Sequence, residues 1–196
     1  MFVQVLHAKC TDPGALKSQM DKWQSELMPN AGGFIGSTGG VTDDGELVLV
    51  ARFSSEEEAR SNSDSDAQSK WWEETSRYLE NVEFHDCTEI MEWGGGGSDE
   101  AGFVQVIEGK AGPDAQMPTE EDDARNREVR PDVLGGYTAI HGEGDGSFTT
   151  VAYFTSEEEA RKGEQNPEFQ KQQQEEMKGV EFSRFWDLRE PMLITR

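Results

Sequence analysis

The chain has 196 residues, 34% of them hydrophobic, and its 40 acidic against 18 basic residues give a formal charge of −22. A surface this acidic repels phosphate backbones and anionic lipid, so we expect neither nucleic-acid binding nor attachment to a membrane surface. No apolar run approaches the roughly 20 residues of a membrane span. Because Met1–Gln4 contains no basic leader, we expect a cytoplasmic protein, with Cys10 and Cys87 as free thiols.

Two halves of the sequence repeat each other. Phe2–Leu6 (FVQVL) returns 101 residues later as Phe103–Ile107 (FVQVI), and Phe53–Arg60 (FSSEEEAR) returns at the same spacing as FTSEEEAR. The triplet VEF at 82–84 returns after 98 residues. A constant shift with one small deletion indicates duplication, and each copy is large enough to be a domain.

The repeat predicts the organisation of the chain into two units. The first unit is predicted at 1–93 and the second at 103–196. Between them, residues 94–102 (GGGGSDEAG) form a glycine-rich linker for which we expect no structure of its own.

The first copy follows the order strand, helix, strand, strand, helix, strand. Asp12-Pro13 is a typical helix start, and Ser55 with Glu58 is the pattern of a capping box. The elements expected from hydrophobic periodicity and turn residues are a strand at 2–8, a helix at 12–27, strands at 34–42 and 47–53, a helix from 55 to 80 that breaks near 62–64, and a strand at 82–93.

The second copy repeats this order. Its expected elements are a strand at 103–108, a helix at about 114–130, strands at 136–142 and 148–154, a helix at 156–178 and a strand at 180–189. Residues 119–130 are nearly all polar, so we expect this first helix to be exposed or frayed.

A βαββαβ unit is a ferredoxin-like α+β fold in which both helices cover one face of an antiparallel sheet. The bare face needs a cover, so we expect the sheets of the two copies to pack face to face. The motif FSSEEEAR, the break at Asn62-Ser63-Asp64 and the pair Trp71-Trp72 resemble those of the dimeric α/β-barrel superfamily, in particular the antibiotic-biosynthesis-monooxygenase (ABM) domain. The resemblance implies an intramolecular pseudo-dimer, expected as a monomer, with homodimers also possible.

The resemblance also implies a ligand cavity between sheet and helices in each copy. Members of the superfamily include oxygenases without metal or flavin, haem-degrading enzymes and isomerases. The leading hypothesis is a monooxygenase-like protein that acts on a small aromatic metabolite with O₂ and no bound cofactor. The alternatives are a non-catalytic binding or stress-related protein and, third, an isomerase or cyclase.

Candidate site residues in the first copy are of two kinds. His7 and His85 are the candidate catalytic bases, on strands expected to be neighbours, although the residue type and position favour a half-exposed strand residue for each. The candidate substrate-binding residues, on the second helical region, are Asn62, Trp71, Trp72 and Tyr78. Phe169 and Gln170 replace the two tryptophans in the second copy, which favours core packing for Trp71 and a functional role for Trp72.

The second copy keeps neither histidine, since Glu108 and Ser183 stand in their places. It carries instead the candidates His141, Tyr137, Tyr153, Arg184 and Trp186. We therefore expect the first copy to hold the working site.

Other constellations argue against further cofactors. Residues 55–79 and 156–178 contain no histidine to bind haem iron, which is the ligand that the haem-degrading relatives use. No CxxC, HExxH, GxGxxG or GxSxG motif occurs, and no two histidines stand three or four residues apart. We therefore expect no dedicated metal site and no bound nucleotide.

Overall fold

The computed structural model describes residues 1–115 and 119–196 and divides into two compact units. Unit 1 comprises Met1–Glu89 with Met192–Arg196, and unit 2 comprises Ile90–Pro191. The limits at 1–93, 94–102 and 103–196 stay a prediction about the repeated sequence. By spatial contacts, residues 90–93, the end of the last strand predicted for the first copy, belong to unit 2, and the C-terminal segment belongs to unit 1.

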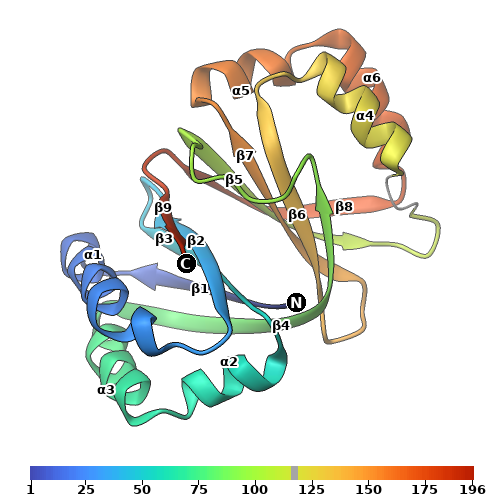
Figure 1. Cartoon of the computed structure of the whole chain (residues 1–196). Coiled ribbons are helices and arrows are strands. Elements are labelled where there is room, and N and C mark those ends of the chain that lie inside the picture. Colours follow the sequence, from blue (N-terminus) through green and yellow to red (C-terminus); the bar gives the residue numbers. More distant parts are fainter. Residues whose placement is uncertain (116–118) are drawn as a thin grey trace. The chain divides into compact units, whose positions relative to one another are not determined.

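Unit 1 has the predicted α+β order, followed by one strand that the sequence did not predict. Its elements are β1 (Phe2–Cys10), α1 (Pro13–Lys22), β2 (Phe34–Val41), β3 (Glu46–Phe53), α2 (Glu56–Ser63), α3 (Asp66–Thr75), β4 (Leu79–Trp93) and β9 (Met192–Thr195). Its strands lie in the order β4-β1-β3-β2-β9 (Figure 1). β9 is antiparallel to β2, with Ser37 opposite Ile194, and it escaped prediction because four residues give too short a pattern.

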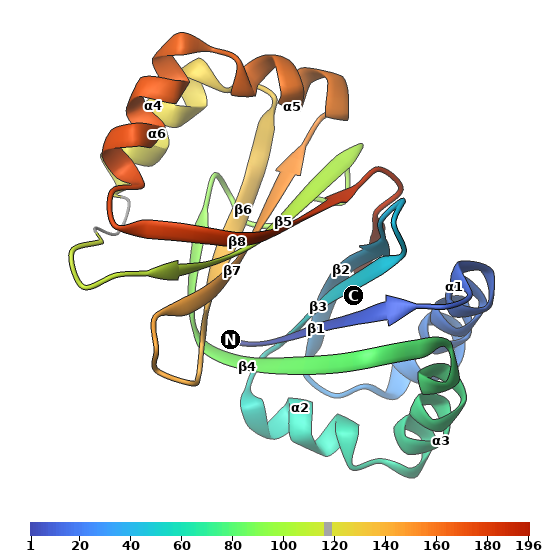
Figure 2. The same cartoon turned by 180° about the vertical axis from the view of Figure 1, so that it is seen from behind.

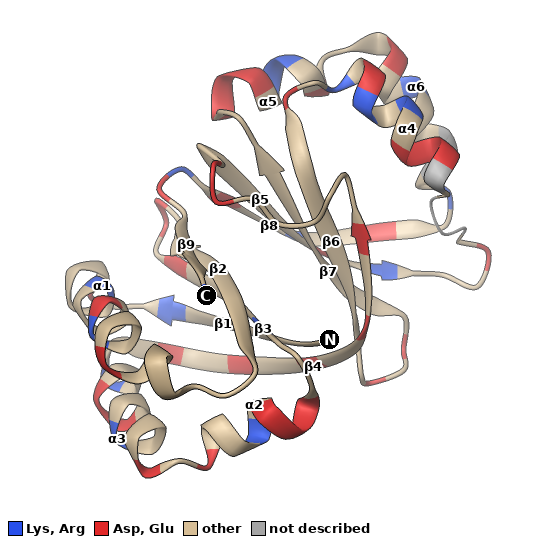
Figure 3. Cartoon of the chain, in the orientation of Figure 1, with Lys and Arg blue, Asp and Glu red and all other residues tan. Residues whose placement is uncertain are grey.

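The helix starts in unit 1 follow from their capping residues. The Asp12 carboxylate accepts a hydrogen bond from the Ala15 amide (2.9 Å), and Pro13 opens α1. The Ser55 hydroxyl accepts from the Glu58 amide (3.2 Å). The Glu58 side chain lies against Gly33 rather than completing the predicted capping box. The acidic first turns of α2 and α5 (Glu157–Glu164), visible in Figure 3, complement the positive ends of their helix dipoles.

The helices α1, α2 and α3 cover one face of the sheet in unit 1 (Figures 1 and 2). The core between them is aromatic: Trp23 contacts Phe34 edge-to-face, with ring centroids 4.9 Å apart, and lies 6.5 Å from Trp71. Trp23 belongs to a π-helical turn (Trp23–Leu27) that continues α1. These rings fill the space between sheet and helices in unit 1.

Unit 2 repeats the same order of elements. They are β5 (Phe103–Ala111), α4 (Glu120–Val129), β6 (Val133–His141), β7 (Ser147–Phe154), α5 (Glu157–Glu164), α6 (Pro167–Glu176) and β8 (Val180–Leu188). The strands lie in the order β8-β5-β7-β6, and α4, α5 and α6 cover one face (Figure 2). None of the helices in the described ranges has the length and apolarity to span a membrane.

Two helix predictions in unit 2 need correction. The single helix predicted at 156–178 is two helices, because Pro167 cannot continue a helix and Asn166 caps α6 through the Glu168 amide (2.9 Å). The helix predicted at 114–130 begins at Glu120, and positions 116–118 of that prediction lie outside the described residues. α4 is formed rather than frayed, with a complete capping box between Thr119 and Asp122.

Residues 94–96, the start of the glycine run after β4, form a turn, whereas the linker over 94–102 stays a prediction. Gly94, Gly95 and Gly96 all have positive φ angles, the region that glycine adopts without strain. A side chain on Gly94 would meet the Gly135 Cα at 2.7 Å, and the Gly94 amide donates to Asp123 (3.2 Å). The run therefore holds the end of β4 against β6 and α4 within unit 2.

Candidate functional site

The two histidines predicted as bases lie close together on unit 1. His7 on β1 is opposite Glu83 on β4, and His85 is opposite Val5. The imidazole rings of His7 and His85 are 5.0 Å apart between centroids, which confirms the prediction that these strands bring them together. His7 is buried, at 3% exposure, and its Nδ1 lies 3.3 Å from a Glu83 carboxylate oxygen.

These histidines lie on the sheet face opposite the helices. Leu6 is paired with Phe84, and the Phe84 ring contacts Trp72 on α3 with centroids 5.5 Å apart. Because successive side chains of a strand point to opposite faces, His7 and His85 lie on the other side. The structure therefore separates the predicted bases from the predicted aromatic wall.

The other predicted residues of the first copy lie on the helical side. Trp71 packs in the core and donates from Nε1 to the Gln19 carbonyl (2.8 Å). Tyr78 lies in the turn before β4, where its carbonyl accepts from the Thr11 amide (2.9 Å). Asn62 lies near the end of α2, and its carbonyl accepts from the Ser65 amide (3.2 Å) at the break before α3. In unit 1, Trp71 is therefore a core residue, and Asn62 and Tyr78 accept backbone hydrogen bonds next to helix ends.

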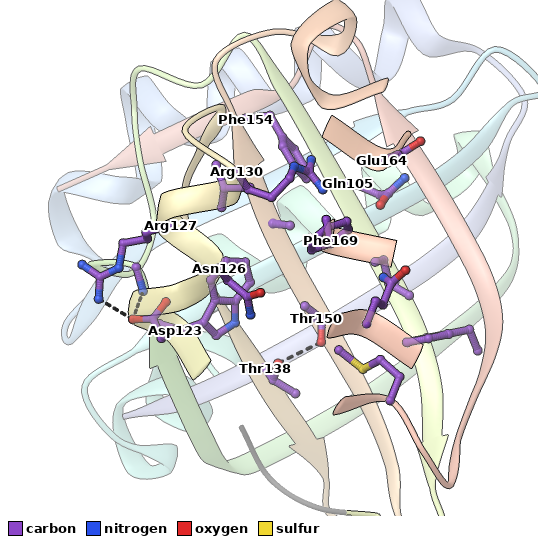
Figure 4. Close-up of a pocket in the computed structure, with 18 of the residues that line it drawn as sticks. Gln105, Asp123, Asn126, Arg127, Arg130, Thr138, Thr150, Phe154, Glu164 and Phe169 are labelled. Carbon is purple, nitrogen blue, oxygen red and sulfur yellow. Dashed lines mark hydrogen bonds and ion pairs between the residues drawn. The ribbon is translucent and has the colours of Figure 1, made fainter. Parts of the chain in front are cut away.

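A cavity of about 1000 Å³ lies between the sheet and the helices of unit 2 (Figure 4). Its position in the unit is the one that the family resemblance implies, but it is in the second copy, not in the copy expected to hold the working site. The strand residues that line it include Gln105, Ile107, Thr138, Thr150, Ala152, Phe154, Phe182, Phe185 and Asp187. The helical ones include Asp123, Asn126, Arg127, Arg161, Glu164, Phe169, Gln173, Gln174 and Met177.

The floor of the cavity is the helix-facing side of the sheet. The hydroxyls of Thr138 and Thr150 share a hydrogen bond of 2.8 Å there, as Figure 4 shows. Phe182 and Phe185 on the edge strand β8 are 39% and 57% exposed, with ring centroids 5.9 Å apart. Trp93 closes another part of the wall, lying directly over Gly136, where a Cβ would come within 2.3 Å of its ring.

A buried arginine forms one wall of the cavity. Arg130 is 3% exposed, and its Nη2 donates to the Asp132 carboxylate (2.7 Å). Its guanidinium also lies over the rings of Phe169 (4.5 Å to the centroid) and Phe154 (5.6 Å). The wall thus combines a cation with two aromatic faces.

Two further arginines line the cavity in ion pairs. Arg161 pairs with Asp187 and with Glu164 (2.8 Å). Burial lowers the pKa of Arg161, but the two carboxylates outweigh it and raise the pKa above its usual range. Arg127 pairs with Asp123, whose carboxylate also accepts a hydrogen bond from the Gly94 amide. Each of these cavity arginines therefore has a carboxylate partner within the protein.

The second-copy residues named by sequence lie on the sheet face opposite the cavity. Tyr153 is opposite Val104 and Trp186 opposite Val106, in the alternate register to Phe103 and Phe154 of the helix-facing core. Tyr137 contacts Tyr153, with centroids 6.3 Å apart. On the same sheet, His141 Nε2 shares a hydrogen bond with the Thr149 hydroxyl (2.8 Å), and Arg184 is opposite Glu108.

The cavity residues were missed although the sequence carried a signal for them. The polar stretch 119–130 replaces the apolar stripe of α1, and we interpreted it as solvent-exposed. Three of its side chains, Asp123, Asn126 and Arg127, line the cavity. The polar helix α4, at the position where unit 1 has the apolar stripe of α1, is therefore the sequence signal for a cavity in unit 2.

Comparisons with known proteins identify the fold and not the activity. No family model and no curated protein matches the chain. A candidate monooxygenase from Lactobacillus acidophilus is similar at a TM-score of 0.63 and 10% identity, covering 100% of this chain and 93% of that one. A second candidate monooxygenase, from Fusobacterium nucleatum, is similar at a TM-score of 0.65 and 7% identity, covering 99% of this chain and 91% of that one. An anthrone oxidase-like protein is similar at a TM-score of 0.64 and 7% identity, covering 100% of this chain and 91% of that one. The chain therefore shares, over almost its whole length, the fold of these solved structures, and in this chain that fold consists of two ferredoxin-like α+β units.

Proposed function

We propose that this chain is a monooxygenase-like protein that takes a small aromatic molecule into the cavity of unit 2 and acts on it with O₂, without a bound cofactor. The observation that carries the proposal is the cavity of about 1000 Å³ itself, which lies at the upper end of the range for small-molecule sites. Its walls combine aromatic rings with a small number of polar groups, as such sites do.

The wall chemistry favours a planar aromatic ligand. Phe169, Phe182 and Phe185 offer ring faces and edges on the helical and strand sides of the cavity. Arg130 offers a guanidinium held in place by Asp132, which suits a phenolate or enolate oxygen. An anionic oxygen near Arg130, with its ring system against Phe169, is the binding mode that we propose.

The oxygenation would use the chemistry of the ligand. Deprotonation of an acidic CH₂ group flanked by aromatic rings gives a carbanion, which transfers an electron to O₂, and the resulting radicals combine to a peroxide. Loss of water leaves a ketone, so one oxygen atom stays in the product and the other leaves as water. The arginine would stabilise the delocalised anion, which is the role of preorganised donors in such reactions.

A non-catalytic binding protein is the second candidate, and one observation favours it. Deprotonation needs a base, and three of the four carboxylates that line the cavity, Asp123, Glu164 and Asp187, are each paired with an arginine, so Glu92 is the fourth candidate. The histidines of unit 1 are not among the residues that line this cavity. Aromatic binding and oxygen consumption must therefore be measured separately.

The test uses the full chain with a panel of anthrones and polycyclic phenols. Binding is followed by quenching of tryptophan fluorescence, since Trp93 lies in the cavity wall, and turnover by oxygen uptake without added metal or flavin. Thr150→Phe fills the floor of the cavity, and we expect it to weaken binding at least tenfold. Leu49→Phe is the matched control, because it places the same ring at the corresponding position of unit 1.

Each outcome decides between the candidates. Binding that Thr150→Phe abolishes, together with oxygen uptake, supports the oxygenase. Binding without uptake supports the non-catalytic protein. If no member of the panel binds, or if Leu49→Phe is as damaging as Thr150→Phe, the assignment of the cavity as an aromatic site is wrong.

A further inference from the structure

We propose that His7, Glu83 and His85 form a binding site for one divalent transition-metal ion, with Zn²⁺ as the probe of choice. The site lies within unit 1, on the sheet face opposite its helices. It is separate from the aromatic cavity of unit 2 and does not depend on the function proposed above.

The geometry of the three side chains carries the proposal. One ligand atom from each residue lies within 4.8 Å of the other two, so a single ion can reach all three with small rotamer adjustments. His7 and Glu83 are directly opposite on β1 and β4, with 3.3 Å between Nδ1 and the carboxylate oxygen. His85 follows Glu83 by two residues and therefore points to the same face.

The ligand set specifies the class of ion. Two imidazoles and one carboxylate suit Zn²⁺ and neighbouring first-row metals, whereas Ca²⁺ and Mg²⁺ prefer all-oxygen sites. Three protein ligands leave at least one coordination position for water or a small ligand. Glu83 is the exposed member, at 54% for its side chain, so the ion has an approach from the Glu83 side.

The second unit indicates that these residues are not needed for the fold. Glu108 and Ser183 stand at the places of His7 and His85, and Ser183 Oγ donates to the Glu108 carbonyl (3.2 Å). The strand pairing of β5 with β8 forms without a histidine in either place. A charge of −22 also raises the concentration of divalent cations near the surface.

Sequence spacing missed this cluster because a metal motif was sought within single elements. No two histidines stand three or four residues apart, but β1 and β4 bring residues 7 and 85 together across the sheet. The strand adjacency was predicted, and the missing step was to place Glu83 on the same face.

The experiment is a Zn²⁺ titration of the untagged, chelator-treated full chain by calorimetry, with Co²⁺ absorption as a second probe. We expect one ion per chain and visible Co²⁺ bands typical of nitrogen ligation. His85→Ala should weaken Zn²⁺ binding beyond the roughly 10–100-fold that loss of a group outside the ligand set costs. Glu83→Gln should weaken Zn²⁺ binding by at least about tenfold, because the amide oxygen that replaces the carboxylate carries no charge.

Asp86→Asn is the matched control. Asp86 directly follows His85 on β4 but faces the other way, where it accepts a hydrogen bond from Gln4 Nε2 (2.9 Å). Removing its charge tests whether Zn²⁺ is held only by the acidic surface, and we expect unchanged affinity. Circular dichroism establishes whether each variant is folded. If His85→Ala does not fold, Glu83→Gln still tests the site, because Glu83 is exposed.

Two results would overturn the proposal. One is the absence of Zn²⁺ binding by the folded wild-type chain at about 100 μM, a concentration at which a site of three preformed ligands should be occupied. The other is equal loss of affinity in Asp86→Asn and Glu83→Gln, which would assign the binding to general surface charge. Neither measurement involves an aromatic ligand or oxygen, so failure here leaves the unit 2 assignment to its own test.

Discussion

The two units share a fold but differ in what fills the space between sheet and helices. In unit 1 this space holds Trp23, with the rings of Phe34 and Trp71 each in contact with it. In unit 2 Val133 takes the place of Phe34, since each is paired with the corresponding phenylalanine of the neighbouring strand. Phe169 takes the place of Trp71, and a cavity of about 1000 Å³ remains. Smaller and more polar side chains on the same backbone plan therefore turn a core into a candidate binding site.

The arginine in unit 2 sharpens the comparison. Arg130 corresponds to Ala31, because each carbonyl accepts a hydrogen bond from the strand residue three positions later: Val133 in unit 2 and Phe34 in unit 1. Ala31 is a buried member of the aromatic core, whereas Arg130 lies over the ring of Phe169. The same backbone position thus supplies a small core residue in one unit and a cationic wall in the other.

The largest effect on stability should come from removing an aromatic side chain from the core of unit 1. Trp71→Ala removes a buried indole that contacts Trp23, and we expect a loss of about 3–5 kcal/mol in the free energy of unfolding. Phe169→Ala, the matched change in unit 2, should cost about 1–2 kcal/mol, because that ring already borders a cavity. Denaturant unfolding measures both, and equal losses would contradict the contrast between a filled and a hollow unit.

A second large effect should come from the buried ion pair of unit 2. Arg130→Met leaves the Asp132 carboxylate, about 6% exposed, without its guanidinium partner. We expect a loss of about 3 kcal/mol, since an uncompensated buried charge is costly. The double variant Arg130→Met with Asp132→Asn should recover part of this stability. No recovery in the double variant would mean that packing of the arginine on Phe154 and Phe169, rather than its charge, stabilises the wall.

Much of this arrangement could be predicted from the sequence, because it depends on patterns within single elements. The alternation of apolar residues gave the strands, and the capping residues Asp12 and Ser55 gave two helix starts. The break between α5 and α6 is also marked in the sequence, by the cap Asn166 followed by Pro167.

The candidate sites could be predicted only in part, because they depend on which way side chains point between elements. The proximity of His7 and His85 followed from strand adjacency, but their face did not enter the prediction. It could have been found by noting that His7 alternates with Leu6 and Ala8, which belong to the helix-facing core. The cavity could not be located, since volume depends on the joint size of residues from β6, β7 and α6.

A smaller effect is expected where β6 meets the end of β4. Gly136→Ala places a Cβ 2.3 Å from the Trp93 ring and from the Val151 carbonyl, so the tryptophan must move. We expect a loss of about 1–3 kcal/mol, which is typical of overpacking. The corresponding residue of unit 1 is Ser37, which already carries a side chain, so Ser37→Ala should cost much less. The shift in the denaturant midpoint of each variant measures the loss of stability. The near-UV circular dichroism of the tryptophans should change only in Gly136→Ala.

The smallest effect concerns the cap of α4, the helix that distinguishes the two units most. Hydrogen bonds from the Thr119 hydroxyl and amide hold the pKa of Asp122 below its ordinary value of 3.8. A carboxyl whose folded pKa is lowered stabilises the folded state above its ordinary pKa, and this contribution is lost as the pH falls through the lowered value. The protection of the α4 amides, measured relative to their intrinsic exchange rates, should therefore decrease below about pH 4, where the unfolded-state carboxyl begins to take up its proton. Asp122→Asn should decrease this protection at neutral pH and remove most of its dependence on pH. Since α1 is held by packing against Trp71 in the filled core of unit 1, its protection should change less over the same range. A parallel response of both helices would indicate global unfolding instead of the loss of a local cap.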